Sequence, residues 1–517
     1  MGKDPRTMLP ILSNAQIRQV DQTTMAREPI SALDLMERAA GRCATKILTL
    51  LAAGSFDPFK RVLAIVGMGN NGGDGLVIAR LLHSAGVPVR VIRVLHRSVA
   101  SPEHQANHAR AIDNGLEVID MDHLSPAIQP FDNELIIDCL FGSGLTRAPE
   151  DWVRAVIIQM DRSGCPIVSI DVPSGLIEPT VAGLFDPASC VRAAYTLVLE
   201  LPRMALLLPE TGPFAGVWHV IPIGLDSEAM AAEEPVARWV ERSDIQGLLK
   251  PLPRFAHKGT FGHAALIAGS SGMLGAAVLA TQACLKSGVG LVTSHIPTSL
   301  AVHLAVVAPD AMTAPQTPEQ DAASPFGSGK YSAIGMGPGL GRSLEAKELV
   351  DNVLHKAVVP IVLDADALNL LAGYPSWFQG MEGRLILTPH PREMDRLLGD
   401  QPRTSYERLM RTREFAMRYQ CTVILKGAYT AVCSSAGQIH FNSTGNCGMA
   451  KGGSGDALTG LLTGLLAQGY SVEQASLIAV YLHGLAGDLA ASELGHDAMR
   501  PTDLIDFLPN AWVQLRS

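Results

Sequence analysis

Short apolar runs alternate with longer amphipathic stretches along most of the chain. In the first half, such runs predict buried strands at 61–66, 89–94, 135–138, 167–171 and 195–199. Helices are predicted at 14–25, opened by a Ser13/Gln16 capping box, at 31–54 and at 75–85. Strands that alternate with helices predict a parallel sheet with helices on both faces.

A second alternating series follows a more charged segment at 226–245. Its strands are predicted at 264–268, 333–335, 361–363, 384–387, 423–425 and 431–433, and its last helices at 453–468 and 473–490. The stretch 259–285 lacks Asp, Glu, Lys and Arg, but its glycines predict a strand, a loop and a buried helix rather than a membrane span. The 517 residues therefore predict two α/β domains, 1–240 and 241–517.

Composition narrows the functional classes. Basic residues number 41 and acidic residues 50, giving a net charge of -9, which argues against nucleic-acid binding. The eight cysteines are scattered without a C-x-x-C pair, so reduced thiols are expected rather than a zinc site or disulfides. The N-terminus lacks the apolar core of a signal peptide. We expect a cytoplasmic protein with no membrane partner that forms a homo-oligomer.

Polar residues gather behind three strands of the first half. Gly67–Gly75 reads GMGNNGGDG, and such a turn presents N–H groups to an anion. Asp138 and Asp171 end two further strands, and ligands of open parallel sheets bind beyond the carboxyl ends of strands. One such Asp alone could be a helix cap or turn former, but three loops together predict a site.

These three segments, GNNGGDG, IDCLFGSGL and SIDVPSG, resemble the epimerase (YjeF N-terminal) domain of the NAD(P)H-hydrate repair family over roughly residues 10–225. The resemblance implies a Rossmann-like three-layer sandwich that interconverts the R and S forms of the hydrated nicotinamide ring. It implies potassium ligands at Asn71, Asp138 and Ser174, and we take Asp171 as the candidate for proton transfer. The implied substrate contacts are Asn70, Asn71, Gly72, Gly73, Asp74, Gly142, Ser143, Gly144, Leu145, Thr146, Arg147, Ala148 and Asp171.

The second half carries its own series of polar loops. The last of them, Asn446–Asp456, ends in GGSGD at the start of a predicted helix, where glycines and a serine make a pocket for negative charge. The Asp could only cap the helix, but other Gly-rich or polar loops accompany it. They are GSSGMLGAA, GMGPGLG, LDADALN, TPHPRE and KGAYT.

This set resembles the NAD(P)HX dehydratase branch of the ribokinase-like fold over about residues 250–510. The resemblance implies dehydration of S-NADHX or S-NADPHX at the cost of ADP with magnesium, through phosphorylation of the ring hydroxyl. It places nucleotide contacts at Lys426, Gly427, Ala428, Tyr429, Thr430 and Gly455, and substrate contacts at Ala276, Gly339, His390 and Asp456. We assign catalysis to Asp456, whereas Asp364, Asp366 and Asn369 are expected to shape the fold.

Two alternatives stay open at this point. The second half could be a ribokinase-like vitamin kinase that releases a stable phosphorylated alcohol. The first half could be a non-catalytic binding scaffold. TPHPRE and KGAYT favour the dehydratase, and the retained Asn71, Asp74, Asp138 and Asp171 favour an active epimerase.

Overall fold

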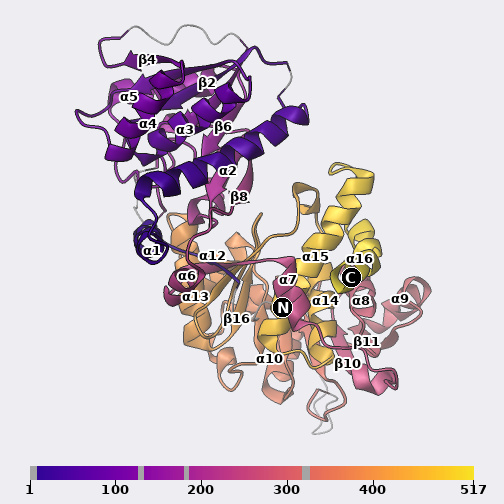
Figure 1. The fold of residues 1–517 in the computed structure, drawn as a ribbon. Coiled ribbons are helices and arrows are strands. Elements are labelled where there is room, and N and C mark those ends of the chain that lie inside the picture. Colours follow the sequence, from indigo (N-terminus) through magenta and orange to yellow (C-terminus); the bar gives the residue numbers. More distant parts are fainter. Residues whose placement is uncertain (1–7, 57, 126–132, 180–184, 317–325) are drawn as a thin grey trace. The chain divides into compact units, whose positions relative to one another are not determined.

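The computed structural model describes residues 8–56, 58–125, 133–179, 185–316 and 326–517. The chain divides into two compact units, Leu9–Val236 and Ala237–Ser517, the second joined by Met8 (Figure 1). The described chain forms a seven-stranded and an eleven-stranded sheet, and helices alternate with their strands along the chain, so the expected α/β class is confirmed.

The described part of the N-terminal unit contains a seven-stranded parallel sheet. Its strands run in the order β4 (Glu117–Met121), β3 (Val89–Val94), β2 (Arg61–Val66), β5 (Glu134–Cys139), β6 (Ile167–Ile170), β7 (Tyr195–Leu199) and β8 (Val217–Ile221). The other elements are β1 (Leu9–Ile11), α1 (Asn14–Arg27), α2 (Ala32–Ala52), α3 (Asn70–Ser84), α4 (Pro102–Asp113), α5 (Asp151–Arg162) and α6 (Ser227–Ala232).

Alternating side chains of β2 build the two faces of this sheet. Val62, Ala64 and Val66 are buried in one apolar cluster with residues of α2 and α3. Leu63 and Ile65 are buried in another cluster with residues of α5. Because successive residues of a strand point to opposite faces, the apolar run Val62–Val66 needs a helical layer on each side. The predicted three-layer sandwich is confirmed.

The C-terminal unit has a larger sheet. Within this unit, the strands run in the order β9 (Ala237–Val240), β18 (Ile439–Asn442), β17 (Ala431–Cys433), β16 (Thr422–Leu425), β15 (Leu385–Leu387), β14 (Ile361–Leu363), β13 (Ala333–Met336), β10 (His263–Ile267), β11 (Leu291–Ile296) and β12 (Met312–Pro315). Its helices are α7 (Arg242–Leu248), α8 (Leu274–Leu285), α9 (Ala301–Val307), α10 (Leu344–Lys356), α11 (Ala365–Leu371), α12 (Pro391–Leu398), α13 (Ser405–Tyr419), α14 (Ser454–Ala467), α15 (Val472–Leu494) and α16 (Pro501–Arg516).

Helix α14 lies in the centre of the C-terminal core. Leu458, Leu461 and Leu465 are buried at helical spacing. Gly460 lets α14 approach α8 closely, because a Cβ there would lie 2.0 Å from the Ala280 carbonyl oxygen. The glycines of ALTGLLTGLLA therefore serve helix packing.

The structure confirms several local predictions and corrects others. The Ser13/Gln16 capping box opens α1, and the charge-free stretch 259–285 folds as β10, a loop and α8. The helix expected at 75–85 begins already at Asn70, so the prediction of a loop through Gly75 was wrong. Strand β9 and helix α6 occupy the charged segment 226–245, and β9 pairs with β18 in the second unit.

Helix α15 is the one helix of the described chain that is long and apolar enough to cross a membrane. Within the structure, 83% of the apolar 18-residue stretch of α15 is buried, which is typical of a core helix.

Candidate active sites

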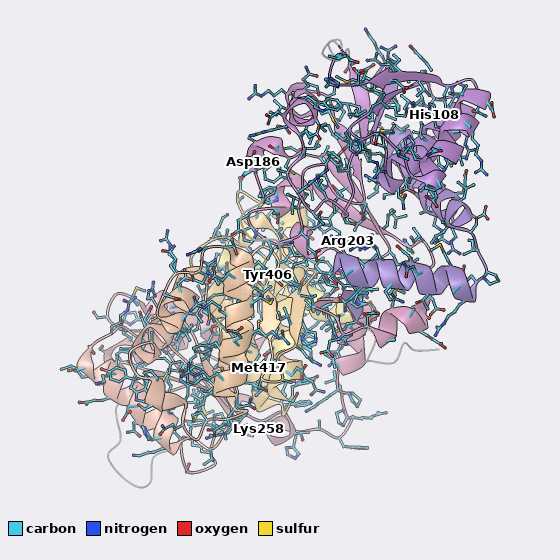
Figure 2. The ribbon with its side chains drawn as sticks, turned by 90° about the vertical axis from the view of Figure 1, so that its left-hand side faces the viewer. His108, Asp186, Arg203, Lys258, Tyr406 and Met417 are labelled. Carbon is cyan, nitrogen blue, oxygen red and sulfur yellow. The ribbon has the colours of Figure 1, made fainter. Side chains whose placement is uncertain are left out.

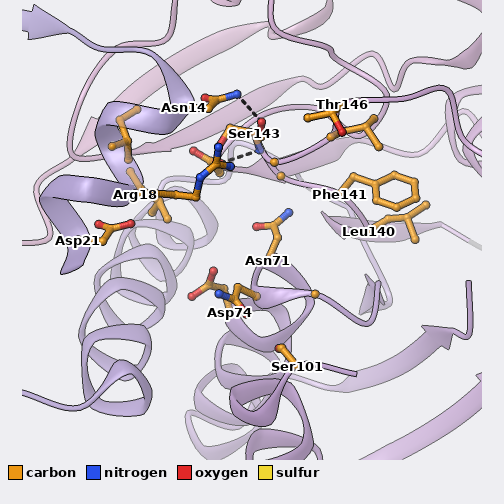
Figure 3. A pocket seen from close by; sticks show the side chains of 18 of the residues that line it. Asn14, Arg18, Asp21, Asn71, Asp74, Ser101, Leu140, Phe141, Ser143 and Thr146 are labelled. Atoms are coloured by element: carbon orange, nitrogen blue, oxygen red, sulfur yellow. Dashed lines mark hydrogen bonds between the residues drawn. The ribbon is translucent and has the colours of Figure 1, made fainter. Parts of the chain in front are cut away.

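A cavity of about 610 Å³ opens at the carboxyl ends of β2, β5, β6 and β7 (Figure 3). The structure brings many of the predicted substrate residues to its wall, together with residues of α1. Those predicted are Asn70, Asn71, Asp74, Gly142, Ser143, Gly144, Leu145, Thr146, Arg147 and Asp171; those not predicted include Asn14, Arg18, Asp21, Arg97 and Arg203.

Gly72, Gly73, Asp138, Ala148 and Ser174 do not line the cavity. A Cβ at Gly72 would lie 1.8 Å from the Gly67 carbonyl oxygen, and one at Gly73 would lie 2.7 Å from the Met36 sulfur. These two glycines therefore allow the first turn of α3 to pack against its surroundings. Ala148 is exposed.

Asp171 follows β6 in the left-handed backbone region, with φ at 67°. Arg203 donates from Nη2 to its Oδ1 at 2.9 Å, and the Ser143 N–H donates to its Oδ2 at 2.9 Å. Burial by itself raises the pKa of Asp171, but the Arg203 charge and the Ser143 bond outweigh burial and hold the pKa below its usual range. Asp171 is therefore an ionised carboxylate.

Asp74 is buried in the first turns of α3, and its pKa is shifted in the opposite direction to that of Asp171. Burial, together with the charges of Asp171 and Asp21, raises the pKa of Asp74 well above its usual value. The cavity thus contains one carboxylate whose pKa is lowered, Asp171, and another whose pKa is raised, Asp74.

Asn71 points its amide into the site without a partner. Both Oδ1 and Nδ2 are buried and accept or donate no hydrogen bond among the described residues. A Cβ at Gly142 would lie 3.2 Å from both Asn71 Cβ and Asp171 Oδ2, so Asn71 and Asp171 border the same glycine. Orphaned buried polar atoms are costly, so this amide is suited to a ligand.

Asp138 lies beneath the cavity in a closed hydrogen-bond network. It accepts from Ser174 Oγ at 2.5 Å, the Ser174 N–H at 2.8 Å, Ser169 Oγ at 2.7 Å and the Leu140 N–H at 3.3 Å. Burial raises its pKa, and these donors act against the rise. Asp138 and Ser174 thus tie the ends of β5 and β6 together.

Sequence reasoning missed Arg203 and Asp21. Arg203, labelled in Figure 2, is buried, and its Nη1 has no partner among the described residues. Arg203 could have been predicted from the sequence, because it comes just after the apolar strand β7 and a charge there lies at the ligand-binding edge of the sheet. Asp21 lies inside an ordinary helix and gave no such signal.

The second site lies at the carboxyl ends of five neighbouring strands, β10, β13, β14, β15 and β16. The loops after them, the first turn of α8 and the start of α14 carry the predicted dehydratase residues. A Cβ at Gly339 would lie 3.0 Å from Ala276 Cβ, so these two predicted substrate residues are adjacent.

Lys426 is held by Asp364 rather than left free for a ligand. Its Nζ donates to Asp364 Oδ1 at 2.9 Å, and Thr459 Oγ1 donates to Asp364 Oδ2 at 2.9 Å. Burial opposes both charges, but the pairing raises the pKa of Lys426 and lowers that of Asp364. This ion pair places a positive charge beside Gly455, where an added Cβ would lie 3.2 Å from Nζ.

Asp456 lies in the first turn of α14, whose N-cap is Gly453 with φ at 105° and which no side chain caps. Burial, together with the charge of Asp364, raises the pKa of Asp456 to about 7, against the opposing effect of Lys426. A carboxylate with a pKa near neutrality is suited to general base catalysis. The uncapped N–H groups beside it suit an anion.

His390 and Asp366 also have local partners. His390 caps α12 by accepting from the Arg392 N–H, and its ring nitrogen lies 3.4 Å from a Glu393 oxygen. Asp366 accepts from the Gly341 N–H at 2.9 Å and from Arg342. In the described parts of the chain, no group of three His, Cys, Asp or Glu residues could hold a metal ion.

Comparisons with known proteins match both halves. A family model described as NAD(P)H-hydrate dehydratase matches residues 264–510, and one described as YjeF-related protein N-terminus matches residues 32–205. The chain is 35% identical to a bifunctional NAD(P)H-hydrate repair enzyme of Moorella thermoacetica, over 96% of each chain. It is 34% identical to one of Coxiella burnetii, over 97% of this chain and 99% of the other.

Among solved structures, residues of this chain superpose on an ADP/ATP-dependent NAD(P)H-hydrate dehydratase from Bacillus subtilis, co-crystallised with ATP and Mg²⁺. The identity is 32%, the TM-score is 0.48, and the match covers 53% of this chain and 97% of the other.

Proposed function

Because the chain belongs to the family of bifunctional NAD(P)H-hydrate repair enzymes, we propose that it restores hydrated NADH and NADPH with two sites in one polypeptide. The N-terminal unit is the epimerase, which interconverts R- and S-NAD(P)HX. The C-terminal, ribokinase-like unit is the ADP-dependent dehydratase, which returns S-NAD(P)HX to NAD(P)H. The relatives that match over the whole chain are repair enzymes, so the vitamin-kinase alternative is not supported.

The observation that carries the dehydratase is the surroundings of Asp456. Phosphoryl transfer to the ring hydroxyl needs a base for the hydroxyl proton and positive charge for the phosphate. Asp456, with its pKa raised to about 7, accepts the proton, and the N–H groups at the start of α14 face the phosphate. The Lys426–Asp364 pair lies beside them. Phosphate then leaves its ring carbon and a proton leaves the neighbouring carbon, which forms the C=C bond of the reduced nicotinamide ring; ADP, having given up its phosphoryl group, is released as AMP.

Magnesium would accompany the nucleotide phosphates at this site. Both oxygens of Asp364 and both oxygens of Asp366 already accept hydrogen bonds, which leaves no protein cage for the ion. Mg²⁺ usually keeps several waters and binds together with substrate phosphates rather than in a dedicated protein cage, so these surroundings fit an ion carried by ADP. The ion would screen the charge of the phosphates.

The epimerase site is supported by the unlike carboxylates of its cavity. Asp171 is ionised and hydrogen-bonded to Arg203, so it can accept a proton from a bound ring. The buried Oδ1 of Asn71 fits a potassium ion, which prefers oxygen ligands. Asp138 and Ser174 would complete the ligands once the Ser174 hydroxyl, which now donates to Asp138, turns away. The ion would hold the substrate near the loop after β5.

One assay tests the function. Purified protein is given racemic NADHX with ADP, with ATP or with neither, and the absorbance of reduced nicotinamide is followed. We expect full conversion with ADP and no conversion without nucleotide. Accumulation of a stable phosphorylated product without reduced nicotinamide would instead show a kinase.

A further inference from the structure

Asp21 is a carboxylate of the epimerase cavity that belongs to none of the sequence motifs. It comes from α1, whereas Asn71 and Asp74 come from α3, and Figure 3 shows the three side chains around one space. Among the described residues, no hydrogen bond or ion pair holds the Asp21 carboxylate, and only burial and nearby charges act on it. An unheld carboxylate that faces a polar cavity is available to a ligand.

We propose that Asp21 is a catalytic residue of the epimerase, the acid that gives its proton to the ring hydroxyl while ionised Asp171 receives the proton released at the opposite face. The proposal rests on the proposed function. It adds a partner to Asp171, because inverting a carbon needs groups on both of its faces.

The charges around Asp21 and Asp171 explain why Asp21 is the proton donor and Asp171 the proton acceptor. Arg203 donates to Asp171 from Nη2 at 2.9 Å, and within the described chain no hydrogen bond from Arg203 to Asp21 is found, so Asp171 is the stabilised anion. Toward Asp21, α3 presents Asp74, the loop after β6 presents Asp171 and the segment after β7 presents Glu200 and Arg203. Glu200 itself is occupied by the N–H groups of Ile223 and Gly224. Burial, together with the charges of Asp171 and Glu200, raises the pKa of Asp21 to about 6, against the opposing effect of Arg203.

The reaction balances with these two groups alone. The Asp21 carboxyl protonates the hydroxyl oxygen of the hydrated ring, the C–O bond breaks and water leaves, while the ring nitrogen lone pair forms the C=N bond. Water then adds to the other face of the same carbon as the C=N pair returns to nitrogen, and the water proton passes to Asp171. Proton exchange with solvent restores both carboxyl groups, and no oxidant or reductant is needed.

The test uses the full-length protein and pure R-NADHX, with epimer ratios followed by chromatography. The variants are Asp21→Asn, Asp21→Glu and, as a matched control, Asp113→Asn, which changes an exposed carboxylate at the end of α4. We expect Asp21→Asn to lower kcat by about 100-fold or more with KM changed less than about threefold, as for loss of a general acid. Asp113→Asn should match the wild type, and Asp21→Glu should keep part of the activity.

Two further readouts separate catalysis from a structural role. The wild-type kcat should fall as pH rises above about 6, because the acid loses its proton, and this limb should persist in Asp21→Glu and vanish in Asp21→Asn. In H₂¹⁸O, each inverted molecule should gain solvent oxygen.

Several results would overturn the proposal. Equal kcat for Asp21→Asn and wild type removes Asp21 from the chemistry, and a change confined to KM makes it a binding residue. Inversion without ¹⁸O uptake contradicts the C–O step. Wild-type protein that leaves R-NADHX unchanged overturns the proposed epimerase and this inference with it, whereas an active wild type with an equally active Asp21→Asn overturns this inference alone.

Discussion

Single carboxylates in this protein take different roles because their surroundings differ. Arg203 keeps Asp171 ionised and Lys426 pairs with Asp364, whereas no hydrogen bond or ion pair among the described residues holds the Asp456 carboxylate. Replacing Asp456 by Asn should therefore remove a base without breaking an ion pair. We expect a loss of about 10²–10⁴-fold in dehydratase turnover, or about 3–5 kcal/mol of transition-state stabilisation.

ADP affinity of the Asp456→Asn protein, measured by calorimetry, should stay the same or rise slightly, because a negative charge near the phosphates is gone. If ADP binding collapses while turnover at saturating ADP stays near normal, Asp456 is a nucleotide ligand and its assignment as the base fails.

The pH dependence of the dehydratase follows from the same residue. With its pKa raised to about 7, Asp456 is a base only when deprotonated, so turnover should rise with pH through about 7 and then level off.

The same raised pKa makes the stability of the fold change with pH in the opposite direction. A carboxyl with a raised folded pKa stabilises the fold below its unfolded pKa, and that contribution is lost as pH rises through about 7. A rate profile that is flat from pH 6 to 8 would contradict this role.

Potassium dependence tests Asp138. Because Asp138 joins Ser174 and Ser169 beneath the cavity, Asp138→Ala should weaken substrate binding and remove any activation of epimerisation by potassium. The measurement compares epimerase rates in potassium and in a large organic cation at equal ionic strength. Equal wild-type rates in both buffers would exclude potassium from the mechanism.

At the scale of elements, the start of α14 depends on a single backbone conformation. Gly453 has φ at 105°, and a Cβ there would lie 2.5 Å from Leu279 Cδ1. Gly453→Ala should lower the free energy of unfolding by about 1–3 kcal/mol, since such backbone strain has this cost, and should reduce dehydratase turnover.

The neighbouring glycine of the same motif supplies the control for Gly453→Ala. Gly452 has open space where a Cβ would lie, so Gly452→Ala should melt close to the wild type in a thermal scan. Equal melting temperatures for both variants would show that the left-handed conformation of Gly453 is not needed.

At the scale of the molecule, each unit has its own apolar core and carries its own candidate site, so each should act alone. A fragment 9–236 should epimerise without nucleotide. A fragment 237–517 should dehydrate with ADP and stop at half of a racemic mixture, and mixing the two should complete the conversion. Absorbance of reduced nicotinamide measures all three.

A fragment that begins at 241 serves as the comparison. It lacks β9, whose Ala237 and Val240 are buried beside β18, so it should be less stable than the fragment that begins at 237. If neither 9–236 nor 237–517 is soluble and active while the whole chain works, the two halves depend on each other for folding.

The sequence by itself determined the elements and the loops that carry chemistry. Buried parallel strands are nearly all apolar, and the polar residues that end them must lie at one edge of the sheet, so Asp171 could be predicted as a site residue from local order. Asn71 and Asp456 could be predicted from the glycine-rich motifs that contain them. Glycine-rich motifs left the start of α3 ambiguous, because the same glycines suit a loop and the close packing of a helix turn.

Only the tertiary structure decided which charged side chains lie close to one another. Asp21 and Arg203 are 182 positions apart in the numbering, and nothing local shows that α1 brings one beside the other at the cavity. The pairing of Lys426 with Asp364, which leaves Asp456 as the available base, likewise joins loops of separate strands. A pKa depends on burial and on charges within a few ångströms, and these are properties of packing rather than of position along the chain.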